Sequence, residues 1–168
     1  MSVSQISNFR WLSPLGISVI LFLLLALFDV ISGALTPFFV RPDRMSSNIL
    51  LTSERTDTAL FGASPEALIA QDRPLGTLRW LLNIWIGGLM LGFGLLQITI
   101  AWFGLRAGQT WALWSLTIAD LSMVPFCWLI LARYSQAGAM PGPGELPPMV
   151  TYLLVIPIAA LLGWIGLR

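Results

Sequence analysis

Four stretches of this chain are apolar over about the length that a helix needs to cross a bilayer. They cover residues 14–40, 80–105, 109–132 and 146–167. A transmembrane helix needs about 20 apolar residues to span a hydrocarbon core of roughly 30 Å. The second and fourth stretches hold no charged residue, and the first and third hold one acid each. We therefore predict an all-α polytopic membrane protein, a four-transmembrane-helix up-down bundle.

The scarcity of charge supports this prediction. Only 10% of the 168 residues are charged and 57% are hydrophobic, whereas a soluble domain carries roughly 25% charged residues. The length fits one domain, so we expect residues 1–168 to form a single membrane domain with the lipid bilayer as its main partner. The net charge is +1, and nothing in it indicates nucleic acid as a partner.

The first apolar stretch has an alternative interpretation as a cleaved signal peptide. Arg10 precedes it, and Ser32-Gly33-Ala34 resembles a cleavage site. However, the stretch is longer than the usual apolar region of roughly 7–15 residues, and Asp29 lies just before the site. We therefore favour a first transmembrane helix.

The connections between the stretches differ in kind. The turn Arg106-Ala107-Gly108 is so short that the second and third helices must form an antiparallel hairpin. The long polar loop 41–79 holds five basic and five acidic residues. Within it, Ser64-Pro65-Glu66 is typical of a helix start, with an N-cap, a proline and then an acid. This indicates either a short interfacial helix on the membrane surface or a solvated loop with one helical turn.

The arginines do not give one consistent orientation. Arg10, Arg106 and Arg168 lie on one side without any acid, while the other side carries six arginines. Counting arginines alone would place the long loop in the cytoplasm. Because the short segments on the first side are purely basic, we predict both termini to be cytoplasmic, in a bacterial inner (cytoplasmic) membrane.

Several kinds of chemistry are excluded by residues that the chain lacks. It has no His and no Lys, and Cys127 is its only cysteine. The chain therefore cannot supply histidine ligands for haem or zinc, a lysine Schiff base or a redox cysteine pair. We predict no catalytic residues, no metal site and no cofactor.

The two acids inside the apolar stretches are the main candidate site. Asp29 and Asp120 lie near the middle of the first and third stretches, which run in the same direction, so both acids have a similar depth. Polar groups are costly inside a membrane and are often functional. Other polar residues that could join this candidate intramembrane polar site are Asn83, Gln97 and Thr117.

Three interpretations of these acids remain open. They could form a proton-coupled or cation-binding site, a neutral acid hydrogen-bonded to Asn83, Gln97 or a backbone carbonyl, or a pair with an arginine from a partner subunit. No arginine lies within any apolar stretch. Because an ionised carboxylate is unfavourable there without a counter-ion, we predict that at least one of Asp29 and Asp120 is protonated at neutral pH.

Small residues predict where helices pack closely. Gly87 and Gly94 belong to a stripe of amides and small residues on one face of the second stretch. Gly88 and Gly92 form a separate GxxxG pattern, available for a second contact or for self-association. The simpler explanation for both patterns is packing within the bundle.

Two prolines lie inside the third and fourth stretches. Pro125 and Pro157 should kink these helices and free the carbonyls of Leu121 and Leu153. A kink at Leu121, next to Asp120, would either line a small polar cavity or simply adjust the packing.

Several of the eight tryptophans lie where interfacial aromatic residues are expected. These are Trp11, Trp80, Trp111 and Trp164.

Two segments carry a resemblance to known proteins. Ala101–Ala112 (AWFGLRAGQTWA) and Leu60–Leu68 (LFGASPEAL) resemble a loose group of small uncharacterised four-span bacterial membrane proteins. In that group, a loop with a short helix precedes an apolar helix and an Arg-x-Gly-x-x-Trp-Ala turn. The resemblance covers about residues 60–115, and it implies a topology without implying an activity.

Three hypotheses of function follow. The first is a non-catalytic accessory or interaction component, as a homo-oligomer or in a larger membrane complex. The second is a small transporter or lipophile-binding protein that uses Asp29 and Asp120. The third is an enzyme acting on a lipid, which the missing His, Lys and cysteine pair disfavour.

Overall fold

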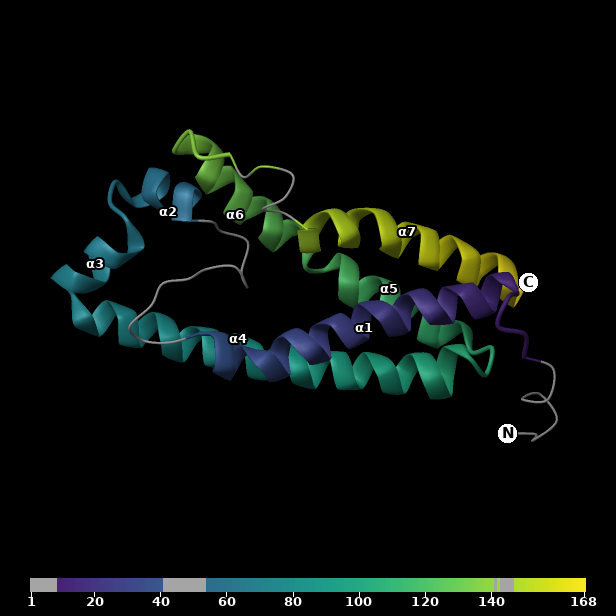
Figure 1. The fold of residues 1–168 in the computed structure, drawn as a ribbon. Helices are drawn as coiled ribbons and strands as arrows, with labels where there is room; N and C mark the ends of the chain where they lie inside the picture. Colours follow the sequence, from purple (N-terminus) through teal and green to yellow (C-terminus); the bar gives the residue numbers. More distant parts are fainter. Residues whose placement is uncertain (1–8, 41–53, 141, 143–146) are drawn as a thin grey trace. The chain divides into compact units, whose positions relative to one another are not determined.

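The computed structural model describes residues 9–40, 54–140, 142 and 147–168, and its regular structure is entirely helical (Figure 1). This confirms the all-α class. The elements in chain order are α1 (Pro14–Phe39), α2 (Glu54–Phe61), α3 (Pro65–Gln71), α4 (Arg73–Thr99), the π-helix η2 (Ile100–Leu105), α5 (Thr110–Leu121), α6 (Val124–Gln136) and α7 (Pro147–Leu167).

Three helical segments are long and apolar enough to cross a membrane. They are Pro14–Phe39, Pro74–Leu105 and Thr110–Gln136, and α7 adds a shorter apolar segment, Leu153–Leu167. The structure is therefore compatible with a membrane protein, while the fourth span stays a prediction. The second segment begins at Pro74, before the expected residue 80, because α4 already starts at Arg73.

The contacts divide the chain into two units. The first contains Met1–Val30, Gly92–Val124 and Thr151–Arg168, and the second contains Ile31–Leu91 and Pro125–Val150. Long helices contribute to both units. The prediction of a single membrane domain stays a prediction.

In the first unit, neighbouring helices run in opposite directions. Gly166 of α7 lies against Leu15 of α1, and the Ser18 hydroxyl of α1 donates to the Ala159 carbonyl of α7 over 2.7 Å. A Cβ on Gly94 of α4 would lie 2.7 Å from a carbonyl of α1, so these two backbones are also close. The buried core of this unit consists of Val19, Phe22, Leu25, Ala101, Leu105, Ala112, Leu113, Leu116, Ile156 and Ala159.

The hairpin expected at residues 106–108 is confirmed. Gly108 has a positive φ of 74°, which a residue without a side chain adopts without strain. The chain widens into the π-helix η2 just before this turn, and the Arg106 N–H donates to the Ala101 carbonyl. Gly104 of η2 then packs directly on Ala112 of α5. The sequence patterns did not reveal the π-helix.

The third apolar stretch does not form one continuous helix. α5 ends at Leu121, a turn occupies residues 122–123, and α6 begins at Val124. Pro125 explains the break, because it has no N–H to donate to the Leu121 carbonyl. Pro125 is tolerated in the first turn of α6, because the backbone N–H groups of a first turn have no partner within the helix. The expected kink is therefore a full interruption, whereas Pro157 remains inside α7.

In the second unit, α1 and α4 approach each other through glycines. A Cβ on Gly33 would lie 2.5 Å from the Gly87 carbonyl oxygen and 2.6 Å from the Leu91 nitrogen. A Cβ on Gly87 would lie 2.7 Å from the Thr36 side chain. Only glycine permits this backbone contact.

The long loop contains two short helices. The Ser64 hydroxyl accepts a hydrogen bond from the Ala67 N–H at the start of α3, which confirms the helix start expected at Ser64-Pro65-Glu66. α2 was not expected, and residues 41–53 of this loop lie outside the described residues. The Arg55 side chain donates to the Met140 carbonyl over 3.3 Å.

The contact at Gly33 generates a stability prediction. Gly33→Ala should lower the free energy of unfolding by about 1–3 kcal/mol, because the new methyl group meets backbone atoms that cannot move aside. Thermal unfolding in detergent would measure this loss. Gly88→Ala is the matched control, since a Cβ there meets nothing within 4 Å. Equal stability of the two variants would show that α1 and α4 are not in backbone contact.

Candidate functional site

The structure pairs one of the two predicted acids with one of the predicted amides. Asp120 of α5 is completely buried, and Gln97 of α4 is 3% exposed. The Gln97 side-chain nitrogen, Nε2, donates a hydrogen bond to Asp120 Oδ1. Both residues belong to the first unit. The two helices of the hairpin are therefore also joined by a buried polar contact, between the C-terminal part of α4 and the last turn of α5.

This pair is incompletely satisfied. Asp120 Oδ2 and Gln97 Oε1 are buried, and neither has a hydrogen-bond partner among the described residues. Both atoms are acceptors when the acid is ionised, so they cannot bond to each other. A proton on Asp120 supplies one O–H donor, which is what the pair lacks. A neutral carboxyl group has an O–H donor and a carbonyl acceptor, and the Gln97 amide has an N–H donor and a carbonyl acceptor, so the two groups are complementary.

Asp29 lies in the same unit as this pair. Its side chain on α1 is 3% exposed, and its carboxyl group lies within electrostatic range of Asp120. Two carboxylates so placed repel each other when both are ionised. The two acids that the sequence placed at similar depth are thus brought into one region of the first unit.

The remaining predicted polar residues are used within their own helices. The Thr117 hydroxyl donates to the Leu113 carbonyl over 2.8 Å, one turn before Asp120 on α5. Asn83 lies in the second unit, where its amide nitrogen donates to the Arg79 carbonyl over 2.9 Å. Neither bond joins two helices.

The four predicted packing glycines fall into two groups. Gly87 and Gly94 contact α1, as described above. Gly88 and Gly92 are exposed, and a Cβ on either would meet nothing within 4 Å. Within the described chain, this GxxxG face of α4 is therefore not used for packing.

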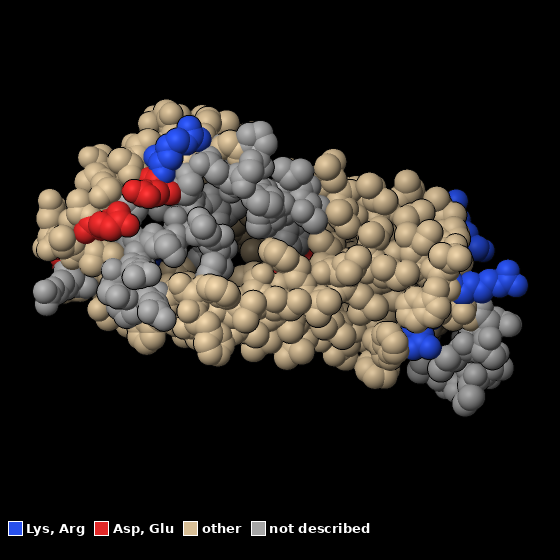
Figure 2. Space-filling view, viewed as in Figure 1, with Lys and Arg blue, Asp and Glu red and all other residues tan. Residues whose placement is uncertain are grey.

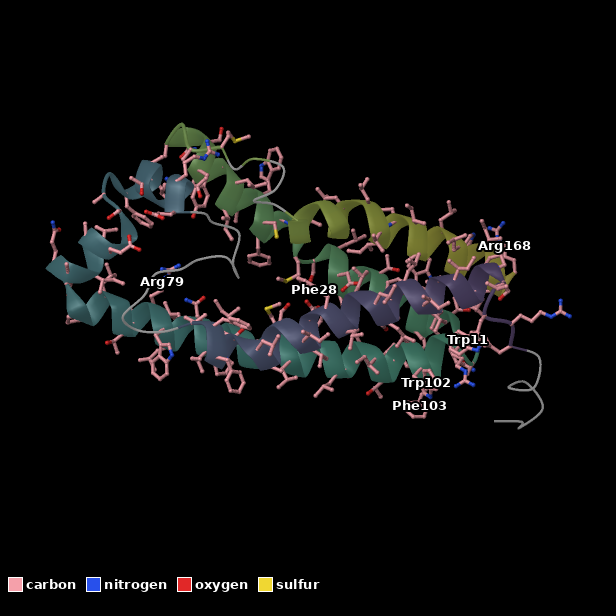
Figure 3. The ribbon with its side chains drawn as sticks, viewed as in Figure 1. Trp11, Phe28, Arg79, Trp102, Phe103 and Arg168 are labelled. Carbon is pink, nitrogen blue, oxygen red and sulfur yellow. The ribbon has the colours of Figure 1, made fainter. Side chains whose placement is uncertain are left out.

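A second cluster was missed by the sequence analysis. The Arg106 guanidinium lies over three aromatic rings, with its central carbon 4.5 Å from the Trp102 ring centroid, 5.6 Å from Phe9 and 5.7 Å from Trp11. Trp11 and Trp102 are labelled in Figure 3. Arg and Trp near the ends of apolar stretches were a signal, but their convergence on one guanidinium depends on the fold.

The described residues contain no group of three potential metal ligands among His, Cys, Asp and Glu. Cys127 is a free, half-buried thiol. Comparisons with known protein families, with curated proteins and with solved structures found no match. The resemblance to small four-span bacterial proteins therefore stays a prediction.

The Gln97–Asp120 bond can be tested by stability. Gln97→Leu removes the donor at a similar side-chain volume, so it should lower the free energy of unfolding by about 1–3 kcal/mol. Chemical unfolding in detergent would measure the effect. Asn83→Leu should cost less, because Asn83 bonds only to its own helix. A larger loss for Asn83→Leu would contradict the importance of the pair.

Proposed function

We propose that the chain crosses a membrane four times, with α1, α4 and η2, α5 and α6, and α7 as the spans. α7 has 21 residues, which corresponds to about 30 Å of helix and so to one bilayer core. The alternating helix directions in the first unit support the same topology.

The exposed side chains support insertion into lipid. Large apolar residues are exposed along the helices, including Leu24, Phe28 and Ile31 on α1 and Trp85 and Leu89 on α4. Phe28 is labelled in Figure 3, and Figure 2 shows few charged side chains against an extensive uncharged surface. Soluble monomers rarely expose apolar patches of this extent.

The proposed location is a bacterial cytoplasmic membrane with both termini in the cytoplasm. Arg10, Arg106 and Arg168 all belong to the first unit. The segments that carry these three arginines contain no acid, and the proposed orientation rests on that observation.

The topology can be tested by reporters fused to the two termini. Four spans place both termini on one side, so a reporter that is active only in the cytoplasm should work at either end. A reporter that requires export should fail at both ends. Opposite results at the two termini would indicate an odd number of spans and contradict the proposal.

Within the membrane, we infer that the protein binds a proton at Asp120, as a small transporter or lipophile-binding protein would. The observation that carries this inference is the pair of unpartnered oxygens, Asp120 Oδ2 and Gln97 Oε1. One proton satisfies both atoms at once. Asp29 strengthens the inference, because its nearby carboxyl group makes full ionisation of both acids unfavourable.

Release of that proton would leave two buried acceptors and a negative charge near Asp29. Such a state is unfavourable unless water, a cation or a changed helix arrangement compensates it. The protonation state of Asp120 is therefore coupled to the packing of α4 against α5. This coupling is what a proton-linked transporter requires.

A second candidate function is an accessory or interaction component of the membrane. The observation that favours it is the open face at Gly88 and Gly92 on α4. A small-residue face allows the close approach of a helix from a second copy or from a larger complex. Purification as a complex, with substitutions of both acids tolerated, would favour this candidate over proton binding.

The proton-binding proposal predicts a neutral carboxyl group at pH 7. The infrared spectrum of the wild type should contain a protonated-carboxyl band that disappears in Asp120→Asn, while the unfolding midpoint stays close to that of the wild type. Asparagine keeps a donor where the neutral acid has its O–H group. Proton flux into liposomes should disappear in the same variant.

Asp72→Asn provides the matched control, because Asp72 is exposed on the connection between α3 and α4. It should leave both the carboxyl band and the proton flux unchanged. A wild-type spectrum in which every carboxyl group is ionised at pH 7 would overturn the proposal.

A further inference from the structure

Arg106 has an unusual environment for a charged side chain. Three aromatic rings lie within 5.7 Å of its guanidinium carbon, as given above. Its Nε atom is buried, and no atom of the described residues forms a hydrogen bond with it. Among the described residues no acid is paired with it. The rings of Phe9, Trp11 and Trp102 therefore surround this cation in the described part of the chain.

The aromatic residues are themselves fixed in position. The Phe9 and Trp11 rings meet edge to face at 4.9 Å between centroids, and the Trp11 and Trp102 rings are 6.2 Å apart. The chain turns just before α1, where the Ser13 hydroxyl accepts from the Gly16 N–H and donates to the Arg10 carbonyl. A Cβ on Gly16 would collide with this turn. Phe9 and Trp11 are thus brought onto Arg106 by local structure.

The end of α5 next to this cluster also favours an anion. α5 begins at Thr110, four residues after Arg106, and its N-cap residue Gln109 makes no side-chain capping bond. The first N–H groups of a helix lack helical partners and carry a partial positive charge. The start of α5 and the Arg106 guanidinium both belong to the turn of the α4–α5 hairpin.

The same end of the first unit holds further positive charge. Arg10 is exposed beside Trp11, and Arg168 lies over the Trp164 ring at 4.8 Å. Figure 3 places Arg168 at the same end as Trp11 and Trp102. Aromatic residues beside arginines are typical of the level of lipid head groups.

We propose that Arg106 and the rings of Phe9, Trp11 and Trp102 form a binding site for the phosphate of an anionic phospholipid. The planar guanidinium offers paired N–H donors that match two phosphate oxygens. Stacking on the rings fixes its orientation before the phosphate binds. The rings contact the glycerol and upper acyl region of the lipid. This inference rests on the proposed membrane insertion and is independent of proton binding at Asp120.

Native mass spectrometry of the purified full-length protein tests the proposal. The probes are phosphatidylglycerol, phosphatidylcholine and inorganic phosphate, added to delipidated protein in detergent. The wild type should retain phosphatidylglycerol at least about tenfold more tightly than Arg106→Gln, because the charge-assisted bonds to phosphate are lost. Arg106→Lys should bind with intermediate affinity, because it keeps the charge and loses the planar stack.

Arg10→Gln is the matched control, since it removes the same charge at the same end from an exposed side chain. It should change retention only slightly. Equal losses of lipid retention in Arg106→Gln and Arg10→Gln would indicate general attraction of the lipid to a basic surface. That result would overturn the proposal. Equal retention of phosphatidylcholine, or displacement by inorganic phosphate, would also overturn it.

The outcome can be separated from the tests of membrane insertion and proton binding. The unfolding midpoint of each variant reports whether it has folded. Asp120→Asn should retain phosphatidylglycerol as the wild type does. Loss of lipid in Arg106→Gln with a normal carboxyl band would therefore identify the lipid site alone.

Discussion

Inside an apolar bundle, each polar group has to find its partner within the chain, because neither lipid nor a packed core offers one. Thr99 and Thr117 in the first unit meet this condition through bonds to carbonyls of their own helices. The Ser18 hydroxyl meets it between helices, by donating to the Ala159 carbonyl of α7. The Gln97–Asp120 pair meets the condition only in part. In the proton-binding proposal, one proton on Asp120 completes this pair between α4 and α5.

The two proposed sites apply the same electrostatic rule at different depths. Asp120 lies in the buried interior, where the neutral form of an acid is the favourable one. Arg106 cannot lose its charge, so it lies at the end of the helices with aromatic rings around it. In these proposals, the interior holds a group that can change its charge, and the end holds a group that binds an anion.

Only some of the glycines in this protein lie where two helices pack closely. Gly33 and Gly94 bring α1 and α4 into backbone contact, while Gly88 and Gly92 of the same helix remain open. The spacing pattern separates the Gly87–Gly94 stripe from the Gly88–Gly92 pattern, but it does not indicate which of the two faces α1. Which of them contacts α1 depends on the rotation of α4, and that rotation is set by the neighbouring helices.

The amino-acid sequence by itself determined the helical class, the approximate helix ends, the hairpin at residues 106–108 and the helix start at Ser64. These features depend on local chemistry: apolar length, a glycine with positive φ, and an N-cap followed by proline. The sequence also identified Asp29, Asp120 and Gln97 as polar groups in apolar surroundings.

Only the tertiary structure decided that Gln97, rather than Asn83, bonds to Asp120, and that Phe9, Trp11 and Trp102 converge on Arg106. It also showed that the third stretch breaks after Leu121 and that η2 is a π-helix. The contacts of Gln97 with Asp120 and of Phe9 and Trp11 with Arg106 join residues far apart in the chain, and they depend on the rotation and register of packed helices. Neither quantity is encoded in the spacing of residues along a single helix.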